Sequence, residues 1–338
     1  MQDEFGSISK PGKDSGPQSW GPAKWHAEAA KIYPPATEDF KNIEKLIDDY
    51  ILPGHSPPSP LIDRESGVVT IGSCFAAELR YFLSRFGVSS GSFWVPSGLN
   101  NSFAILDFLQ WCVYGKESDG AYRYDRAEDG DIEEWKPVQA QKDYLQHIAS
   151  ADLFVFTLGL SEVWRHKETL EVFWRGVPDS IFDNNLHTFE VSSVAENKDN
   201  LHGIVECIRF ANKKAPIVLT LSPVPLKATF REISCMTADA VSKSILRVAI
   251  NELMAEKIDN VYYFPSYEIV KWAGGHLSFP AFGLDDGCVR HVSRFLVINI
   301  INSFIKHYAQ RNFYEMFKAK MLAEGLDPSR ERIFAIKR

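Results

Sequence analysis

The residues best suited to chemistry stand where apolar, strand-like runs end. Ser73 follows the run 68–71 and a glycine, and a helical pattern begins directly after it. A serine at such a junction lies beside backbone N–H groups and the positive end of a helix dipole, which favour negative charge. Nucleophilic hydrolases of the α/β type place their serine in this setting. Ser73 is therefore the predicted nucleophile.

A serine hydroxyl is a weak nucleophile and needs a base, and the base needs an acceptor on its second nitrogen. His291 stands just before the C-terminal helical region and is the predicted base. Asp286 lies five residues earlier in a loop with a glycine, so the chain can turn back and let it orient the imidazole. Asp285 is the competing acid.

An acyl-transfer site also needs fixed donors for the oxyanion. The sequence offers the backbone N–H groups of Ser73 and Gly98 and the side-chain amide of Asn101 or Asn100. Asparagines in such a stretch also form turns and cap helices, which is an alternative for both amides. Glu162, after the third predicted strand, is a further candidate for binding substrate.

Two alternatives compete for the start of the first helix. Ser73 itself has the residue type of a helix N-cap, the commonest reason for a serine before an apolar helical run. Cys74 is a rival nucleophile, because a thiolate at a helix start is also stabilised. Its helical neighbours are apolar, which favours a buried structural cysteine.

Strand and helix alternate along the main part of the chain, with continuous apolar strands of the kind found in parallel sheets covered on both faces. This pattern predicts an α/β fold, a three-layer α/β/α sandwich around a mainly parallel sheet. The strand 170–174 is expected to pair as a hairpin with 162–164. The predicted strands are 68–72, 93–98, 153–158, 216–221 and 261–264, and the predicted helices are 74–86, 101–114, 143–150, 197–211, 237–257 and 293–321.

The composition indicates three parts of the chain. Prolines break residues 1–66 into an arm with one helix packed on the main domain, which spans 67–310, and a helical extension covers 311–338.

A net charge of −7 argues against binding nucleic acid through phosphates. No apolar run is long enough for a membrane span. The five scattered cysteines predict reduced thiols and a cytoplasmic location, and no metal or cofactor motif emerges.

Five motifs in order resemble the GSCFA domain family, which in turn looks like the SGNH/GDSL hydrolase superfamily, over about residues 20–310. The resemblance implies a flavodoxin-like sandwich with a Ser-His-Asp site acting on ester bonds. The superfamily's last block has aspartate three residues before histidine, where this chain has Cys288, so either Asp286 substitutes or the site is a dyad. The third block's Gly-x-Asn-Asp is replaced here by residues 159–162. The motifs are Gly72-Ser73-Cys74-Phe75-Ala76, 157–164, 221–225, 263–268 and 290–292.

These observations predict a serine-dependent hydrolase of small acyl esters, plausibly acetyl groups on a saccharide. An O-acyltransferase that modifies a polysaccharide or glycolipid would use the same residues. A catalytically silent module that binds glycans through its aromatic surface is the third hypothesis. Hydrolase and transferase differ in how well the pocket excludes water, which the sequence does not encode in any motif.

Overall fold

A parallel sheet forms the centre of the fold. The computed structural model describes residues 31–86, 95–96, 99–117, 122–126 and 132–329. Within these residues the central sheet has the strand order β1-β4-β7-β8, with parallel pairing throughout. Because every residue of β4 and β7 is buried, both faces of the sheet must be covered. The strands are β1 (Val68–Gly72), β4 (Leu153–Leu158), β7 (Ile217–Leu221) and β8 (Val261–Phe264).

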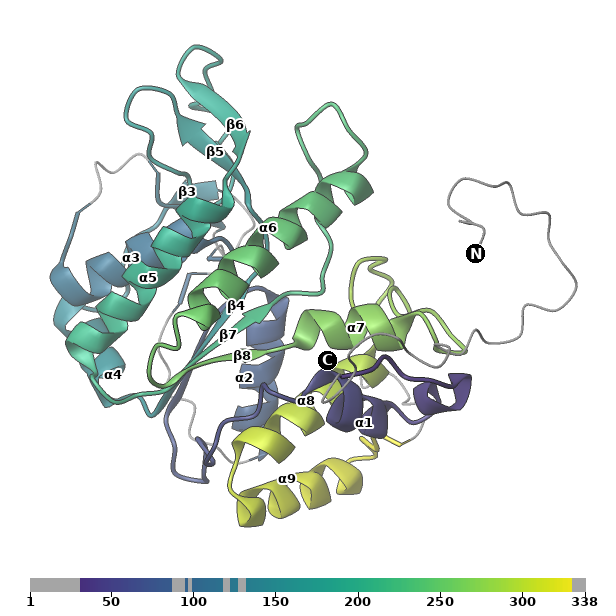
Figure 1. The fold of residues 1–338 in the computed structure, drawn as a ribbon. Coiled ribbons are helices and arrows are strands. Elements are labelled where there is room, and N and C mark those ends of the chain that lie inside the picture. Colours follow the sequence, from purple (N-terminus) through teal and green to yellow (C-terminus); the bar gives the residue numbers. More distant parts are fainter. Residues whose placement is uncertain (1–30, 87–94, 97–98, 118–121, 127–131, 330–338) are drawn as a thin grey trace, which may run out of the picture.

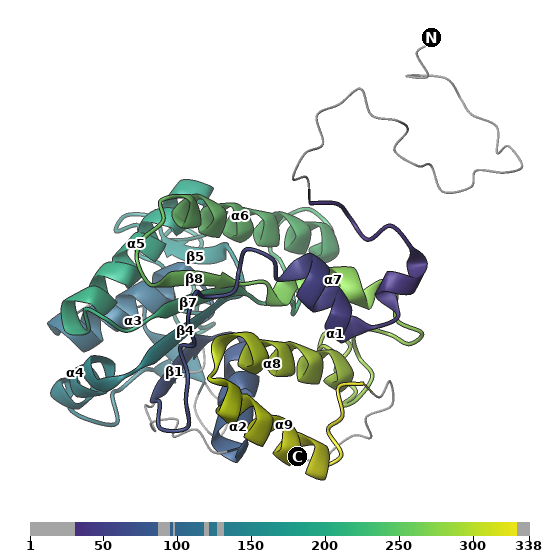
Figure 2. The same ribbon diagram turned by 60° about the horizontal axis from the view of Figure 1, so that its bottom comes forward.

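Helices cover the sheet on both sides and give the predicted three-layer α/β/α sandwich (Figures 1 and 2). One side carries α2, α7 and α8, with α9 packed against α8 and α2. The other side carries α3, α4, α5 and α6. The helices are α2 (Cys74–Phe86), α3 (Ser102–Tyr114), α4 (Gln141–Ser150), α5 (Val194–Ala211), α6 (Cys235–Ala255), α7 (Ser266–Gly274), α8 (Arg294–Tyr308) and α9 (Arg311–Ala323).

The side chains of each strand point alternately to the two faces of the sheet and pack into two separate hydrophobic cores. Val68 and Val155 pack with α2 and α8, whereas Val69, Phe154 and Phe156 pack with α3 and α5. Successive side chains of a strand point to opposite faces, so one apolar strand supplies both cores. The sheet is held firmly from both sides, and its carboxyl edge is a rigid base for the loops that follow it.

The segment before β1 lies against α8. It contains a 3₁₀ turn (Thr37–Phe40), α1 (Ile43–Leu46) and a π-helical turn (Ile47–Ile51), and Ile47 is fully buried. Lys306 of α8 bonds the carboxylates of Glu44 and Asp48 at 2.7 and 2.6 Å. Burial disfavours the charged form of Asp48, but hydrogen bonds from His307 and Lys306 outweigh it and hold the pKa of Asp48 below its usual value.

The hairpin after β4 differs from the prediction. β5 (Glu162–His166) pairs antiparallel with β6 (His187–Val191), which the sequence analysis missed. The expected partner, 170–174, makes one isolated bridge to β5, between Arg165 and Val172. A second hairpin joins β2 (Tyr124–Arg126) and β3 (Ile132–Glu134).

The other predicted elements fall within a few residues of the observed ones, with the C-terminal helical region divided into α8 and α9. Residues 93–94 and 97–98 of the predicted strand 93–98 lie outside the described residues, and Val95 and Pro96 are not in a strand. Within the described ranges, no helix has the length and apolar character to cross a membrane.

Gly72 ends β1 in a conformation that needs glycine. Its φ is +129°, and a Cβ added there would lie 2.1 Å from the carbonyl oxygen of Thr157 in β4. No side-chain rearrangement relieves this clash, because the obstructing atoms belong to the backbone. The close approach lets the chain leave the sheet directly into Ser73.

We predict that Gly72→Ala destabilises the protein by more than about 3 kcal/mol, through the clash and the positive φ together. Gly54→Ala is the matched control, because Gly54 has a φ of +88° with open space around it. The free energy of unfolding of Gly54→Ala should fall by only about 1–2 kcal/mol. Urea unfolding of both variants measures the difference, and equal losses would show that the contact with β4 is unimportant.

Candidate active site

Ser73 lies at the carboxyl edge of the sheet, between the end of β1 and the start of α2. Its backbone N–H donates to the carbonyl of Thr157 at 3.1 Å, so this N–H is not available to an oxyanion, contrary to the prediction. The Ser73 hydroxyl is buried and has no hydrogen-bonding partner among the described residues. It therefore does not cap α2, and the N-cap alternative is wrong. A buried hydroxyl without a partner costs free energy unless a ligand or a moving group completes it.

Asn100 and Gly159 lie beside Ser73. A Cβ built on Gly159 would stand 3.6 Å from the Cβ of Ser73 and 3.3 Å from the Cβ of Asn100. The backbone N–H groups of Gly159 and Leu160 both donate to the carbonyl of Asn100, at 2.6 and 3.3 Å. The turn after β4 is thereby fixed against the segment before α3, and the half-buried side chain of Asn100 joins the neighbourhood of the hydroxyl.

Asn101 has a structural role that the sequence analysis weighed as an alternative. Its side-chain oxygen accepts from the N–H of Ala104 at 2.9 Å and caps α3. Its amide nitrogen donates to the carbonyl of Trp174 at 3.1 Å, and the residue is only 2% exposed. Of the two predicted amides, that of Asn101 is therefore engaged within the fold. The third predicted donor, Gly98, lies outside the described residues.

His291 and Asp286 form a pair on the loop before α8. The Nδ1 of His291 lies 2.5 Å from Oδ2 of Asp286. Gly287, at a φ of +75°, turns the chain between them, and Oδ1 of Asp286 also accepts from the N–H of Cys288. Asp285 points elsewhere, because its carboxylate accepts from the N–H of Arg294 at the start of α8. The structure thus brings Asp286, not Asp285, to the imidazole.

The loop that carries His291 bridges the carboxyl edge of the sheet. Arg290 donates to the carbonyl of Pro225, which follows β7, at 2.9 Å. Arg294 contacts Glu78 of α2, the helix that begins after Ser73, at 2.5 Å. The imidazole is partly open to solvent, with 37% of its side chain exposed. No hydrogen bond joins it to the Ser73 hydroxyl, so the two predicted parts of the site stand at one edge without direct contact.

Glu162 opens β5, three residues after Gly159. The residue is 5% exposed, and its Oε1 lies 3.4 Å from a guanidinium nitrogen of Arg231. Its Oε2 is buried without a partner in the described part of the chain. Glu162 is thus a buried carboxylate only half satisfied by the protein.

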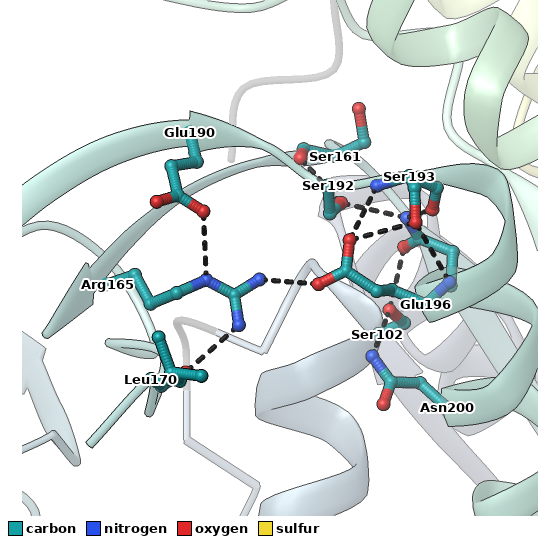
Figure 3. A network of polar contacts seen from close by, with 10 residues as sticks. Ser102, Ser161, Arg165, Leu170, Glu190, Ser192, Ser193, Glu196 and Asn200 are labelled. Atoms are coloured by element: carbon teal, nitrogen blue, oxygen red, sulfur yellow. Dashed lines mark hydrogen bonds and ion pairs between the residues drawn. The ribbon is translucent and has the colours of Figure 1, made fainter. Parts of the chain in front are cut away.

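Polar side chains hold the turn after β4 from below (Figure 3). Ser102 at the start of α3 donates to Asn197 of α5 at 2.7 Å, and Asn197 donates to Ser192 at 2.8 Å. Ser192 in turn donates to the carbonyl of Ser161 at 2.7 Å. Arg165 of β5 extends the same network to Glu196 on α5. These bonds fix the hairpin to α3 and α5, so the residues around Gly159 have a rigid support.

Lys243 on α6 is a residue of this site that the sequence analysis missed. It is 1% exposed, and its ammonium donates to the carbonyl of Gly159 at 2.5 Å. The signal was available: Lys243 falls in line with Leu246, Ile250 and Leu253 at spacings of three and four, on the buried face of α6. A lysine in a core-facing stripe is unusual, because burying its charge is costly without close partners.

Two described cysteines are unsuited to nucleophilic chemistry. Burial raises the pKa of the Cys207 thiol to about 11 and raises the pKa of Cys112 still further. Both thiols stay neutral near pH 7, and a neutral thiol is a poor nucleophile. Within the described ranges, His, Cys, Asp and Glu side chains do not gather in threes as a metal site would need.

We predict that Lys243→Met destabilises the protein by about 2 kcal/mol or more, because the buried carbonyl of Gly159 loses its donor. Lys198→Met is the control, since Lys198 pairs with Glu256 at the surface and should cost less than about 1 kcal/mol. Chemical unfolding compares the two. Similar losses would contradict the proposed support of the Gly159 turn.

Comparison with known proteins places the chain in a family. Residues 67–279 match the family model described as the GSCFA family, which is more than half of the chain. No curated protein matches the sequence. The matched region begins directly before β1 and holds Ser73, Asn100, Gly159, Glu162 and Lys243, whereas the loop with Asp286 and His291 follows it. The chain belongs to the GSCFA family.

Proposed function

We propose that the chain is a serine-dependent hydrolase of small acyl esters, with an acetylated saccharide as the substrate class. The observation that carries this proposal is the buried, unpartnered hydroxyl of Ser73 between β1 and α2. This hydroxyl stands at a helix start beside Asn100, and no described residue bonds it, so it is available to react with a bound ester. The acid–base pair of Asp286 and His291 on the same edge supplies the second half of an acyl-transfer site.

In the proposed mechanism, the Ser73 oxygen attacks the ester carbonyl and its proton passes to Nε2 of His291. Asp286 holds Nδ1, fixes the tautomer and stabilises the imidazolium. The loop bearing His291 closes on Ser73 when substrate is bound, since catalytic hydrogen bonds are often long in the free enzyme. His291 then protonates the departing alcohol, and the acyl group stays on Ser73.

Water completes the cycle. His291 takes a proton from the water, the resulting hydroxide attacks the acyl carbonyl, and the Ser73 oxygen leaves as the proton returns to it. The side chain of Asn100 is the proposed oxyanion donor, and the positive end of the α2 dipole adds to its effect. Lys243 adds positive charge behind the Gly159 peptide, which favours the negative intermediate.

The order of the blocks supports this proposal, because a serine near the first strand and a histidine before the last helix resemble the arrangement of SGNH hydrolases. A saccharide hydroxyl in place of water would make the same residues an O-acyltransferase. The two activities are separated by measuring acetate release against acetyl transfer to added sugars.

We predict that Ser73→Ala lowers the turnover of p-nitrophenyl acetate by at least about 10³-fold, because the nucleophile is lost. A fluorophosphonate probe should label the wild type and leave this variant unlabelled. Cys74→Ala is the control and should retain activity and labelling. Loss of turnover in Cys74→Ala with retention in Ser73→Ala would transfer the nucleophile to the cysteine, and a wild type with neither turnover nor labelling would favour a glycan-binding module.

Asp286→Ala is expected to lower kcat by about 10²–10⁴-fold, because the imidazole loses the group that sets its tautomer. Asp285→Ala is the matched neighbour and removes only the acceptor at the start of α8, at a cost of about 1 kcal/mol of stability. Rates on p-nitrophenyl acetate and urea unfolding separate these effects. A larger loss of rate in Asp285→Ala would contradict the assigned pair.

A further inference from the structure

One face of the β5–β6 hairpin carries aromatic rings and a carboxylate. Glu162 and Trp164 are two residues apart on β5 and share a face, and Phe189 lies opposite Trp164 on β6. The loop 222–234, between β7 and α6, reaches this face at Phe230. The ring of Phe230 from that loop lies 4.9 Å from Trp164 and 5.1 Å from Phe189. We call this set of residues, with Arg231, the hairpin face.

The aromatic part of the hairpin face is open to solvent. Phe230 is 67% exposed, although its ring touches two others. Phe182 is 41% exposed and packs edge-on against Trp164 at 5.5 Å. An exposed phenylalanine costs hydrophobic free energy, and contiguous exposed rings mark a binding surface more often than a single one does.

The carboxylate of Glu162 on the hairpin face has one oxygen without a hydrogen-bond donor among the described residues. Its contact with Arg231 is 3.4 Å, longer than the 2.7–2.9 Å typical of a strong charged hydrogen bond. Its Oε2 has no partner within the described residues, although Glu162 is only 5% exposed. A buried carboxylate oxygen without a donor is destabilising, so this atom calls for a donor beyond those that the described residues supply.

The hairpin face lies within reach of Ser73. Glu162 follows Gly159 by three residues, a span of at most about 10 Å for an extended chain. Gly159 itself stands next to Ser73. The loop 222–234 is also bonded to the loop of His291, through Pro225 and Arg290. The Glu162 end of the hairpin face therefore lies near Ser73.

The chemistry of these groups selects a class of ligand. Glu162 compensates the charge of Arg231, so the face does not favour an anion. A plain acyl chain would satisfy the rings and leave Oε2 without a donor. A pyranose ring has an apolar face for the aromatic side chains and hydroxyls that donate to a carboxylate and accept from a guanidinium.

We propose that the hairpin face is a subsite for a neutral saccharide ring, bound by stacking on Phe230 and Trp164 and by hydroxyl contacts with Glu162 and Arg231. This inference rests on the proposed function in one respect: the sugar is the alcohol part of the ester that Ser73 cleaves. Binding itself needs no chemistry at Ser73. The subsite and the hydrolase can therefore be tested separately.

The test measures binding of the methyl glycosides of glucose, galactose, mannose, xylose and N-acetylglucosamine by saturation-transfer NMR and calorimetry. These probes contain no O-acyl ester, so neither outcome depends on Ser73. The wild type should bind at least one of them with a Kd at or below about 10 mM. Phe230→Ala should weaken that binding about tenfold, which corresponds to the loss of one aromatic contact of about 1.4 kcal/mol.

Phe210→Ala is the matched control, because Phe210 is 65% exposed on α5 and its ring packs on Tyr114, outside the hairpin face. It should leave the Kd unchanged. Glu162→Gln keeps the side-chain volume and should weaken binding at least fivefold, and circular dichroism checks that it folds. If Glu162→Gln does not fold, the Phe230→Ala and Phe210→Ala pair decides the outcome alone.

Three results would overturn the subsite: no binding of any glycoside up to about 50 mM, equal weakening in Phe210→Ala and Phe230→Ala, or saturable binding of hexanoate at Phe230 without binding of sugars. Glycoside binding in a protein that does not turn over p-nitrophenyl acetate would retain the subsite and reject the hydrolase. Turnover of p-nitrophenyl acetate without glycoside binding would retain the hydrolase and reject the subsite.

Discussion

The approach of β1 to β4 at Gly72 is the contact on which the functional edge of this protein depends. The two strands pair in register from Val68–Leu153 to Gly72–Thr157, and the last pair leaves no space for a side chain. The chain therefore enters α2 without an intervening loop. This places Ser73 at the end of β1, where its backbone N–H is paired with the carbonyl of Thr157 and its hydroxyl has no partner among the described residues.

The polar groups at the same edge of the sheet are of two kinds: some hold the fold together through hydrogen bonds, and others have no partner among the described residues. Asn101, Asn197 and Ser192 have their side chains engaged in caps and hydrogen bonds that hold α3, α5 and the hairpin together. In the described part of the chain, Ser73 and Glu162 each retain a buried oxygen without a partner. Most buried polar atoms in proteins are satisfied, so these two oxygens, from a residue beside Gly159 in space and a residue three positions after it in sequence, are the atoms on which the proposed site rests.

Much of the fold follows from the sequence, because long apolar runs and helical periodicity are strong local signals. The strand Leu153–Leu158 and the helix Cys74–Phe86 have the predicted bounds. The strand His187–Val191 was missed because it is short, half-exposed and separated from β5 by a long loop, so no local pattern reports its pairing. The pairing of His291 with Asp286 was anticipated from the glycine between them. Lys243 was not anticipated, although its place in the apolar stripe of α6 was a signal; its partner, the carbonyl of Gly159, lies too far along the chain for a local pattern to predict.

The turn at Gly287 has a consequence for how members of the family are compared. It brings Asp286 and His291 together across an interval of five residues, whereas the superfamily that the motifs resemble has its aspartate three residues before the histidine. A pattern that demands a fixed interval would pass over this pair, although its atoms meet. Such a pair in another GSCFA chain is therefore recognised by the distance between the two side chains in space, and not by the number of residues between them.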